Sequence, residues 1–294
     1  MAQTFESLTR HHQTLTSIRG IVHAMKTLSA LNASPYESAA RSIETYHQTL
    51  IAGFRAFAYR TGDITLPPVP RASQLVVVFG SDHGLCGNYN ERLADGVAAH
   101  CRGAGKNACR LLCIGAQMND ALVDRGLRPD AVLLPPASAE GIGRLAGEVV
   151  TRLAGLPGRP LLQGRTTSLA FTERGETGGQ TPVIRQLLPL APELLKREHR
   201  WPSRALPDYT MAPDALLAAL VRNHIFASVF WASAEAMVTE NAARLARMQQ
   251  AEQAVDDRLE ALNGDLRSVR QSEITSELLD VIIGFEALKK PARR

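Results

Sequence analysis

The sequence predicts a fold of the class α plus α/β, in which N- and C-terminal helices form a long antiparallel coiled coil beside an α/β domain. Two observations predict the helices: residues 1–34 and 214–290 contain no proline, and apolar residues in both recur at steps of three and four. Between them, short apolar runs alternate with helical patterns, which predicts the domain. We expect three parts: a coiled-coil helix over 1–60, a globular domain over 70–190 and a second coiled-coil helix over 210–290.

The C-terminal helix has two apolar seams. The first contains Val255, Leu259, Leu262, Leu266 and Val269, and the second contains Ile274, Leu278, Val281, Phe285 and Leu288. Each advances by 4, 3, 4 and 3 residues, the spacing of a coiled-coil seam. A helix over 214–288 would be about 110 Å long. A single globular core cannot bury a helix of that length, so we expect it to contact other subunits.

The N-terminal segment has a comparable seam. Its members are Leu15, Ile18, Val22 and Met25, followed by Ile43, His47, Leu50, Phe54 and Phe57. Pro35 lies between the two groups and is expected to kink or restart the helix. Because each terminal helix has a narrow seam, we expect the two to pair with each other in antiparallel orientation.

The middle of the chain predicts a small Rossmann-like domain with a five-stranded, mostly parallel sheet. Strands are expected at 75–79, 110–114, 131–134, 167–171 and 183–188, and helices at 91–100, 116–125 and 139–154. Residues 155–165 and 173–182 are expected to form surface loops. Residues 189–213, with five prolines, are expected to form an irregular return segment.

Composition argues against several classes of protein. A net charge of +4 and an aromatic content of 5% do not indicate nucleic-acid binding. The four cysteines form no C-x-x-C pair, so we expect reduced thiols in a cytosolic setting, with Cys109 and Cys113 buried on one face of a strand. The N-terminus resembles neither a signal nor a transit peptide. We also expect no apolar run approaching the roughly 18 residues that cross a bilayer.

Residues 80–90 follow an expected strand and precede an expected helix, the position at which doubly wound sheets usually bind ligands. The segment matches neither a dinucleotide fingerprint nor a P-loop. Asp82, His83 and Cys86 are imaginable metal ligands, but no second ligand cluster supports a metal site. We favour a structural turn or a partner-docking loop formed by Asp82, His83, Gly84 and Cys86.

Polar residues flank the second seam of the C-terminal helix. Gln271, Thr275 and Asp280 share one side, which ordinarily indicates a solvated helix face. The adjacent apolar seam nevertheless requires cover, which fits a helix held inside a sleeve of other subunits. Elsewhere the sequence shows no Ser/His/Asp or Cys/His arrangement and no general acid/base pair, so we assign no catalytic residue.

Four blocks together resemble the gamma subunit of F-type ATP synthases. Residues 81–87 read Ser-Asp-His-Gly-Leu-Cys-Gly, 186–190 read Gln-Leu-Leu-Pro-Leu, 239–245 read Thr-Glu-Asn-Ala-Ala-Arg-Leu, and 270–278 read Arg-Gln-Ser-Glu-Ile-Thr-Ser-Glu-Leu. The Ala24-Met25 pair also fits the family. Departures mark a divergent member: Gly20-Ile21-Val22 replaces Lys-Ile-Thr, His83 and Asn88 replace Arg and Gly, and Glu252 and Ala254 replace a Thr-x-Asn pattern.

The resemblance implies a rotor subunit. In the family, the terminal helices form a coiled coil inside a ring of three alpha and three beta subunits, and catalysis takes place on the beta subunits. Rotation couples ion flow through the membrane sector to ATP synthesis or hydrolysis. The implied partners are the alpha, beta and epsilon subunits and the c-ring, with no cofactor, metal or nucleic acid. Contact with the membrane is indirect, on the cytoplasmic face of a bacterial inner membrane.

The resemblance also assigns roles to residues. Those implied to contact the catch loop of beta or to affect coupling are Met25, Arg244, Gln271, Thr275 and Glu277. Those implied to form an apolar tip in a hydrophobic bearing are Ile274, Leu278, Val281, Ile282, Phe285 and Leu288. The docking turn is implied to rest on the c-ring and to hold epsilon. The alternatives are a small-molecule-binding α/β protein that dimerises through its helices, and a coiled-coil scaffold, which leaves residues 70–190 without a role.

Overall fold

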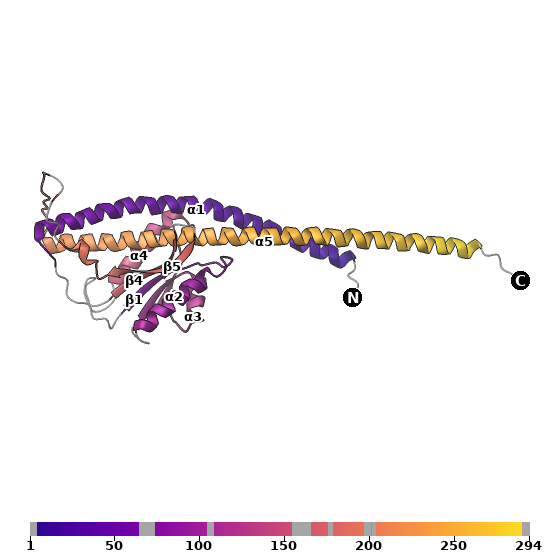
Figure 1. Ribbon diagram of the computed structural model, residues 1–294, viewed down its shortest axis with the longest axis horizontal. Coiled ribbons are helices and arrows are strands. Elements are labelled where there is room, and N and C mark those ends of the chain that lie inside the picture. The colour runs from indigo at the N-terminus through magenta and orange to yellow at the C-terminus, as the bar shows by residue number, and fades with distance from the viewer. Residues whose placement is uncertain are drawn as a thin grey trace. The chain divides into compact units, whose positions relative to one another are not determined.

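The computed structural model (Figure 1) describes residues 5–64, 74–104, 109–154, 166–175, 179–196, 201 and 204–289, without the side chains of 104 and 286–289. The chain divides into two compact units. The paired-helix unit contains Met1–Leu28 and Leu245–Arg294, and the globular unit contains Ser29–Arg244. This division crosses both terminal helices, α1 (Phe5–Thr61) and α5 (Pro213–Lys289), so each unit is described by itself.

The globular unit contains the predicted five-stranded sheet. Its strands are β1 (Gln74–Phe79), β2 (Cys109–Ile114), β3 (Ala131–Leu133), β4 (Thr166–Arg174) and β5 (Gln180–Leu188). They lie in the order β3-β2-β1-β4-β5. All neighbouring pairs are parallel except β4 and β5, which form an antiparallel hairpin. The fold class predicted from the sequence is thereby confirmed.

The β4–β5 hairpin is longer than the sequence predicted. Its register extends to the pair Arg174 and Gln180, so both ends of the segment 173–182, expected as a loop, belong to strands. That expectation was wrong because the pairing of β4 with β5 continues up to the two glycines, and Gly175 N donates to Gly179 O at 2.7 Å. The other expected loop, 155–165, lies outside the described residues.

Helices cover both faces of the sheet, because alternate strand residues point to opposite sides. Val76 and Val78 of β1 pack under α2 (Tyr89–Ala104) and α3 (Ala116–Val123). Leu75, Val77 and Phe79 face α4 (Ile142–Ala154) and the part of α5 in this unit. Short 3₁₀ turns occupy Ala139–Gly141 and Pro192–Leu194.

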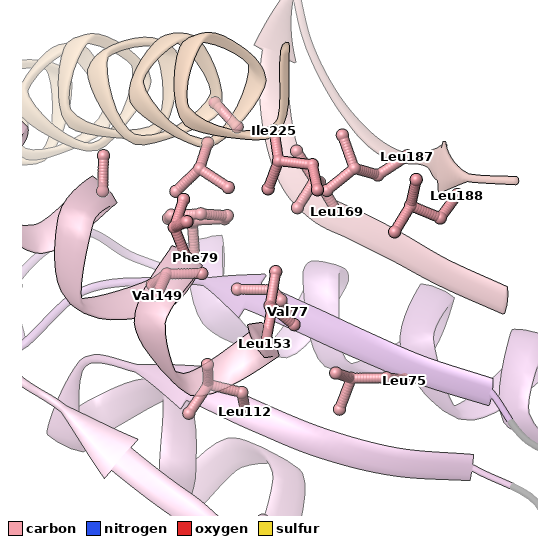
Figure 2. Packing of buried hydrophobic residues seen from close by; sticks show 14 of the residues in the cluster. Leu75, Val77, Phe79, Leu112, Val149, Leu153, Leu169, Leu187, Leu188 and Ile225 are labelled. Atoms are coloured by element: carbon pink, nitrogen blue, oxygen red, sulfur yellow. The ribbon is translucent and has the colours of Figure 1, made fainter. Parts of the chain in front are cut away.

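The α4 and α5 side of the sheet contains the larger core. Figure 2 shows Val149 and Leu153 of α4 and Ile225 of α5 gathered over Val77 and Phe79. Phe54 of α1 is fully buried in the same cluster. Since burying one such side chain contributes about 1.5–3 kcal/mol, this core fixes both terminal helices to the sheet within the globular unit.

The terminal helices are antiparallel in the globular unit. Tyr36 of α1 packs with Val238 of α5, whereas Leu50, further along α1, packs with Ala227. Residue numbers therefore rise on one helix as they fall on the other. The buried positions Ile43, Leu50, Phe54 and Phe57 are those of the predicted seam.

The same orientation holds in the paired-helix unit. Arg19 Nε lies 2.6 Å from Asp256 Oδ1, and His23 Nδ1 lies 3.0 Å from Glu252 Oε1. Lys26 Nζ also contacts Glu252. Val22 and Leu262 are buried between the helices, as their seam positions predict. The antiparallel pairing expected from the seams is confirmed.

Pro35 lies inside one continuous helix, so of the two outcomes expected there, a kink or a restart, the restart was wrong. α1 continues through it from Phe5 to Thr61. A proline inside a helix removes one hydrogen bond to the carbonyl four residues earlier. Here that residue is Leu31, whose side chain is exposed, and Tyr36 and Ala40 are buried against α5 just beyond the proline. Packing on the buried face offsets the lost bond.

The cysteines also differ from expectation. Cys101, near the end of α2, and Cys109, at the start of β2, form a disulfide with 5.6 Å between their Cα atoms. The expectation of four free thiols was wrong because it treated each cysteine alone, whereas the fold brings the end of this helix beside the start of the next strand. Cys86 and Cys113 are free and buried, as expected for Cys113.

α5 contains an 18-residue window with a mean hydropathy of 1.4, of which 28% is buried. By length and composition it is apolar enough to cross a membrane, contrary to the expectation that no stretch approaches this limit. Core helices of soluble proteins satisfy the same criterion, so the window by itself assigns no membrane span.

Candidate partner-binding sites

The turn after β1 is built on two glycines that admit close backbone approach. A Cβ on Gly80 would lie 2.4 Å from the Cβ of Met118 on α3. A Cβ on Gly115 would lie 2.4 Å from Ser81 O, and Gly115 has φ of +104°. Both approaches place the turn against the N-terminus of α3 at the carboxyl end of the sheet.

Buried hydrogen bonds close the base of the turn. Ser81 N donates to Asn90 Oδ1 at 3.0 Å, and Asn90 Nδ2 donates to Ser81 Oγ at 2.7 Å. Ser81 Oγ donates to His83 O at 2.9 Å. Because each of these polar groups is paired inside the protein, the turn has one preferred conformation.

The four predicted docking residues have different environments. Asp82 Oδ1 accepts a hydrogen bond from Ala116 N at 3.1 Å and thus caps α3, where its negative charge is favourable. Cys86 is buried, and burial raises the pKa of its thiol. His83 and Gly84 are exposed at the tip. Of the four residues, these two are the exposed ones.

Leu85 at the same tip was not singled out in the sequence. It has φ of +68° and is 55% exposed, an uncommon combination for a bulky apolar residue. Its left-handed conformation turns the side chain outward beside His83. Nothing in the sequence indicates this backbone conformation, which only the closed turn shows.

Two residues of α5, Glu240 and Arg244, pack against the turn. Arg244 donates to the Glu240 carboxylate and, at 3.5 Å, contacts His83 O. The two side chains are only 12% and 6% exposed. Burial raises the pKa of Glu240, and the neighbouring guanidinium of Arg244 opposes this shift. Arg244, expected as a partner contact, therefore braces the turn.

Tyr89 ties the start of α2 to α5. Its hydroxyl donates to Ala236 O at 2.9 Å and lies 3.1 Å from Thr239 Oγ1. Thr239 in turn donates to Thr172 O of β4 at 3.1 Å. The turn, the sheet and α5 thus share one buried polar network.

The turn does not assemble a metal site. Among the described residues there is no group of three or more His, Cys, Asp or Glu side chains placed to hold an ion. His83 Nδ1 and Asp82 Oδ2 lie 3.9 Å apart, and Asp82 already caps α3.

The second candidate site is the final described segment of α5, within the paired-helix unit. Its apolar residues are 50–69% exposed: Ile274, Leu278, Leu279, Val281, Ile282, Ile283 and Phe285. Gln271 and Glu277 are also exposed, and Thr275 Oγ1 donates to Gln271 O at 2.8 Å. Leu288 lies in the helix, but its side chain is outside the described set. Met25 is half-buried on the α1 seam.

This segment differs from the seam that precedes it. Val255, Leu259 and Leu262 face α1 and are at least partly buried, whereas every described side chain from 270 to 285 is exposed. Leu279 and Ile283 extend the exposed apolar surface beyond the predicted seam. The exposed apolar surface is therefore wider than the predicted seam, and an exposed patch of this kind marks a contact site.

Comparisons with known proteins agree on one family. The sequence model of the ATP synthase family matches residues 4–288. The chain is 27% identical over 309 residues to the ATP synthase gamma chain of Desulfosudis oleivorans, covering 92% of this chain and 96% of that protein. It is 30% identical over 220 residues to the gamma chain of Verminephrobacter eiseniae, covering 72% of each.

Solved structures agree on the fold. A chain in the central stalk and c-ring structure of the Tetrahymena thermophila mitochondrial ATP synthase aligns with a TM-score of 0.55 at 20% identity, covering 79% of this chain and 99% of that one. A chain of the Euglena gracilis mitochondrial enzyme aligns with a TM-score of 0.53 at 14% identity, covering 92% and 98%.

A mostly parallel α/β sheet beside antiparallel terminal helices, one of which ends in an exposed apolar segment, defines a subunit with the fold seen in solved ATP synthase chains. The chain belongs to the ATP synthase family, and within that family it falls among the gamma chains.

Proposed function

We propose that the chain is a non-catalytic rotor that transmits torque between a membrane ion channel and the nucleotide sites of its partner subunits. The observation that carries this proposal is the exposed apolar segment of α5 from Ile274 to Phe285. Water does not favour such a surface, and a ring of subunits would cover it on every side.

The physical basis of coupling is differential contact. A partner's equilibrium between open and closed states shifts only if the rotor contacts the two states differently. Around α5 near residue 275, polar Gln271, Thr275 and Glu277 alternate with the apolar seam. Rotation would therefore present a different surface to each beta subunit in turn.

The residue roles follow from position. Gln271, Thr275 and Glu277 are exposed and are proposed to contact the beta subunits, with Met25 on α1. The bearing is proposed to hold Ile274, Leu278, Val281, Ile282, Phe285 and Leu288. We propose that Arg244 acts indirectly: paired with Glu240, it contacts His83 O and so supports the docking turn.

The docking turn is proposed to contact the c-ring and the epsilon subunit through its exposed tip. His83, Gly84 and Leu85 form that tip, while Asp82 and Cys86 belong to its internal support. This assigns the chain to the cytoplasmic face of a bacterial inner membrane, held there by its partners.

Assembly with the alpha and beta subunits tests the proposal. The chain is co-expressed with both, and the complex is isolated through a tag on beta. We expect the parent chain to copurify, and a Leu278→Asp, Val281→Asp variant to copurify at least ten-fold less. Both positions are exposed in the free chain, so the helix content of the variant should equal that of the parent. Glu260→Gln, exposed elsewhere on α5, is the matched control.

Equal recovery of the double variant and the parent would refute the bearing. The alternative function, a small-molecule-binding α/β protein, predicts that nucleotides raise the melting temperature of the isolated chain. The rotor predicts no such shift.

A further inference from the structure

The end of α2 and the start of β2 carry a cysteine pair that none of the proposed partner contacts uses. Cys101 and Cys109 are joined by a disulfide with 5.6 Å between their Cα atoms, near the commonest value for this bond. Cys101 points from α2 into the core between this helix and the sheet, and Cys109 is partly buried beside it. The fold thus brings both thiols together without help from a partner.

The other two cysteines behave differently. Cys86 and Cys113 are free and buried in separate elements. Burial raises the pKa of both, that of Cys113 to about 12, so almost none of either is the reactive thiolate at neutral pH. They serve as internal controls for any oxidation of the chain.

We propose that Cys101 and Cys109 form a reversible thiol–disulfide site, oxidised by a low-molecular-weight disulfide such as glutathione disulfide, which fastens the end of α2 to the sheet. Disulfides in reducing compartments are usually transient or redox-sensing. The site is separate from the rotor contacts proposed above, because neither cysteine belongs to the docking turn or to the exposed segment of α5.

The reaction is a two-step exchange. The more accessible Cys109, as thiolate, attacks one sulfur of glutathione disulfide, forming a mixed disulfide and releasing one glutathione thiolate. Cys101 then loses its proton and attacks the Cys109 sulfur, closing the protein disulfide and releasing the second glutathione. Two protein S–H bonds are lost and two glutathione S–H bonds form, so the electrons and protons balance.

Oxidation should stabilise the globular unit. Packing of Leu93 and Val97 on the sheet holds α2 in either redox state, so the fold itself does not require the bond. In the unfolded chain the disulfide joins cysteines eight residues apart and so closes a short loop, which reduces the freedom of that chain. For a loop of this length we expect the melting temperature to rise by about 5 °C on oxidation.

The test equilibrates the purified full chain in glutathione buffers of graded ratio, blocks remaining thiols, and identifies linked peptides by mass spectrometry. We expect a Cys101–Cys109 link that dithiothreitol reverses, with Cys86 and Cys113 alkylated after denaturation. The melting temperature of the parent should follow the fraction linked. Cys109→Ser should abolish both changes and leave Cys101 at most glutathionylated, whereas Cys113→Ala should retain the link and the shift.

Two results would overturn the proposal. One is the absence of the Cys101–Cys109 link at every buffer ratio, or its replacement by links between chains. The other is a link that leaves the melting temperature of the parent unchanged, which would show that the disulfide does not stabilise the globular unit.

Discussion

At the scale of the residue, Gly115 determines whether the turn after β1 can approach α3. We expect Gly115→Ala to destabilise the globular unit by about 3 kcal/mol, because φ of +104° and the contact with Ser81 O both exclude a Cβ. Urea unfolding measures the loss. Gly147→Ala is the control: it lies in α4 with open space at its Cβ, and should raise stability by about 0.5–1 kcal/mol. Equal effects of the two substitutions on stability would show that neither the positive φ of Gly115 nor its contact with Ser81 O excludes a side chain.

Arg244 and Glu240 make a second residue-scale prediction, this one with a pH dependence. Arg244→Met leaves a buried carboxylate without its cation and should cost about 3 kcal/mol at pH 8. Loss of the guanidinium raises the pKa of Glu240 further, so the folded variant takes up a proton as pH falls. The cost should therefore shrink towards pH 4.5.

Urea titrations of parent and Arg244→Met at both pH values check this prediction. Arg247→Met, which removes an exposed arginine one turn further along α5, should change stability by less than about 0.5 kcal/mol. A penalty for Arg244→Met that is the same at both pH values would show that Glu240 does not take up a proton between them, and would contradict the prediction.

At the scale of the element, the sequence predicted most of the fold from two signals. Proline-free segments with seams identified α1 and α5, and apolar runs identified the strands, because burial dictates both patterns. The sequence did not decide between a kink and a restart at Pro35, because compensation by packing on one face depends on the partner helix. Nor did it predict the extended β4–β5 hairpin, whose pairing is tertiary.

The pairing of α1 with α5 makes an element-scale prediction. His47 Nε2 lies 3.2 Å from His224 Nδ1, and Phe54 packs edge-on against the His224 ring. Burial, with a smaller contribution from His47, lowers the pKa of His224 to about 4. The unfolded chain binds the proton near pH 6.5, so between these values unfolding takes up protons and stability falls as pH falls.

We expect the globular unit to lose up to about 3 kcal/mol from this histidine between pH 6.5 and pH 4. His224→Asn keeps a hydrogen-bonding group near the Nδ1 position but does not titrate in this range. Its stability should therefore decline less than that of the parent over the same interval, as measured by urea unfolding. Parallel pH profiles for the two proteins would exclude His224 as the titrating group.

At the scale of the whole molecule, the family was predictable from sequence because four motif blocks occur in order along the chain. The roles of individual residues within the two candidate sites were harder to predict from the sequence. Arg244 matches a family position in the sequence, and its i, i+4 spacing from Glu240 can be read there too. That the two side chains are buried together could be learned only from the fold. The exposure of residues 270–285 follows from the length of α5, because within the paired-helix unit α5 extends past Phe5, the first residue of α1 that the structure describes.

Coupling in the assembled enzyme makes the last prediction, at Gln271. Gln271→Leu replaces an exposed polar side chain proposed to contact beta, and leucine has at least equal helix propensity, so the chain should remain folded. Losing about 1 kcal/mol of hydrogen bonding to one state of a beta subunit would slow coupled turnover about five-fold. The measurement compares ATP-driven ion pumping with ATP hydrolysis by the complex in vesicles. Gln249→Leu, the same change at an exposed site of α5 outside the matching block, should leave both rates at those of the parent. The prediction would be contradicted if the Gln271→Leu complex pumped ions at the parent's rate and with the parent's number of ions per ATP. In that case the polar side chains beside the apolar seam do not distinguish the states of beta. Coupling would then depend on the apolar residues alone.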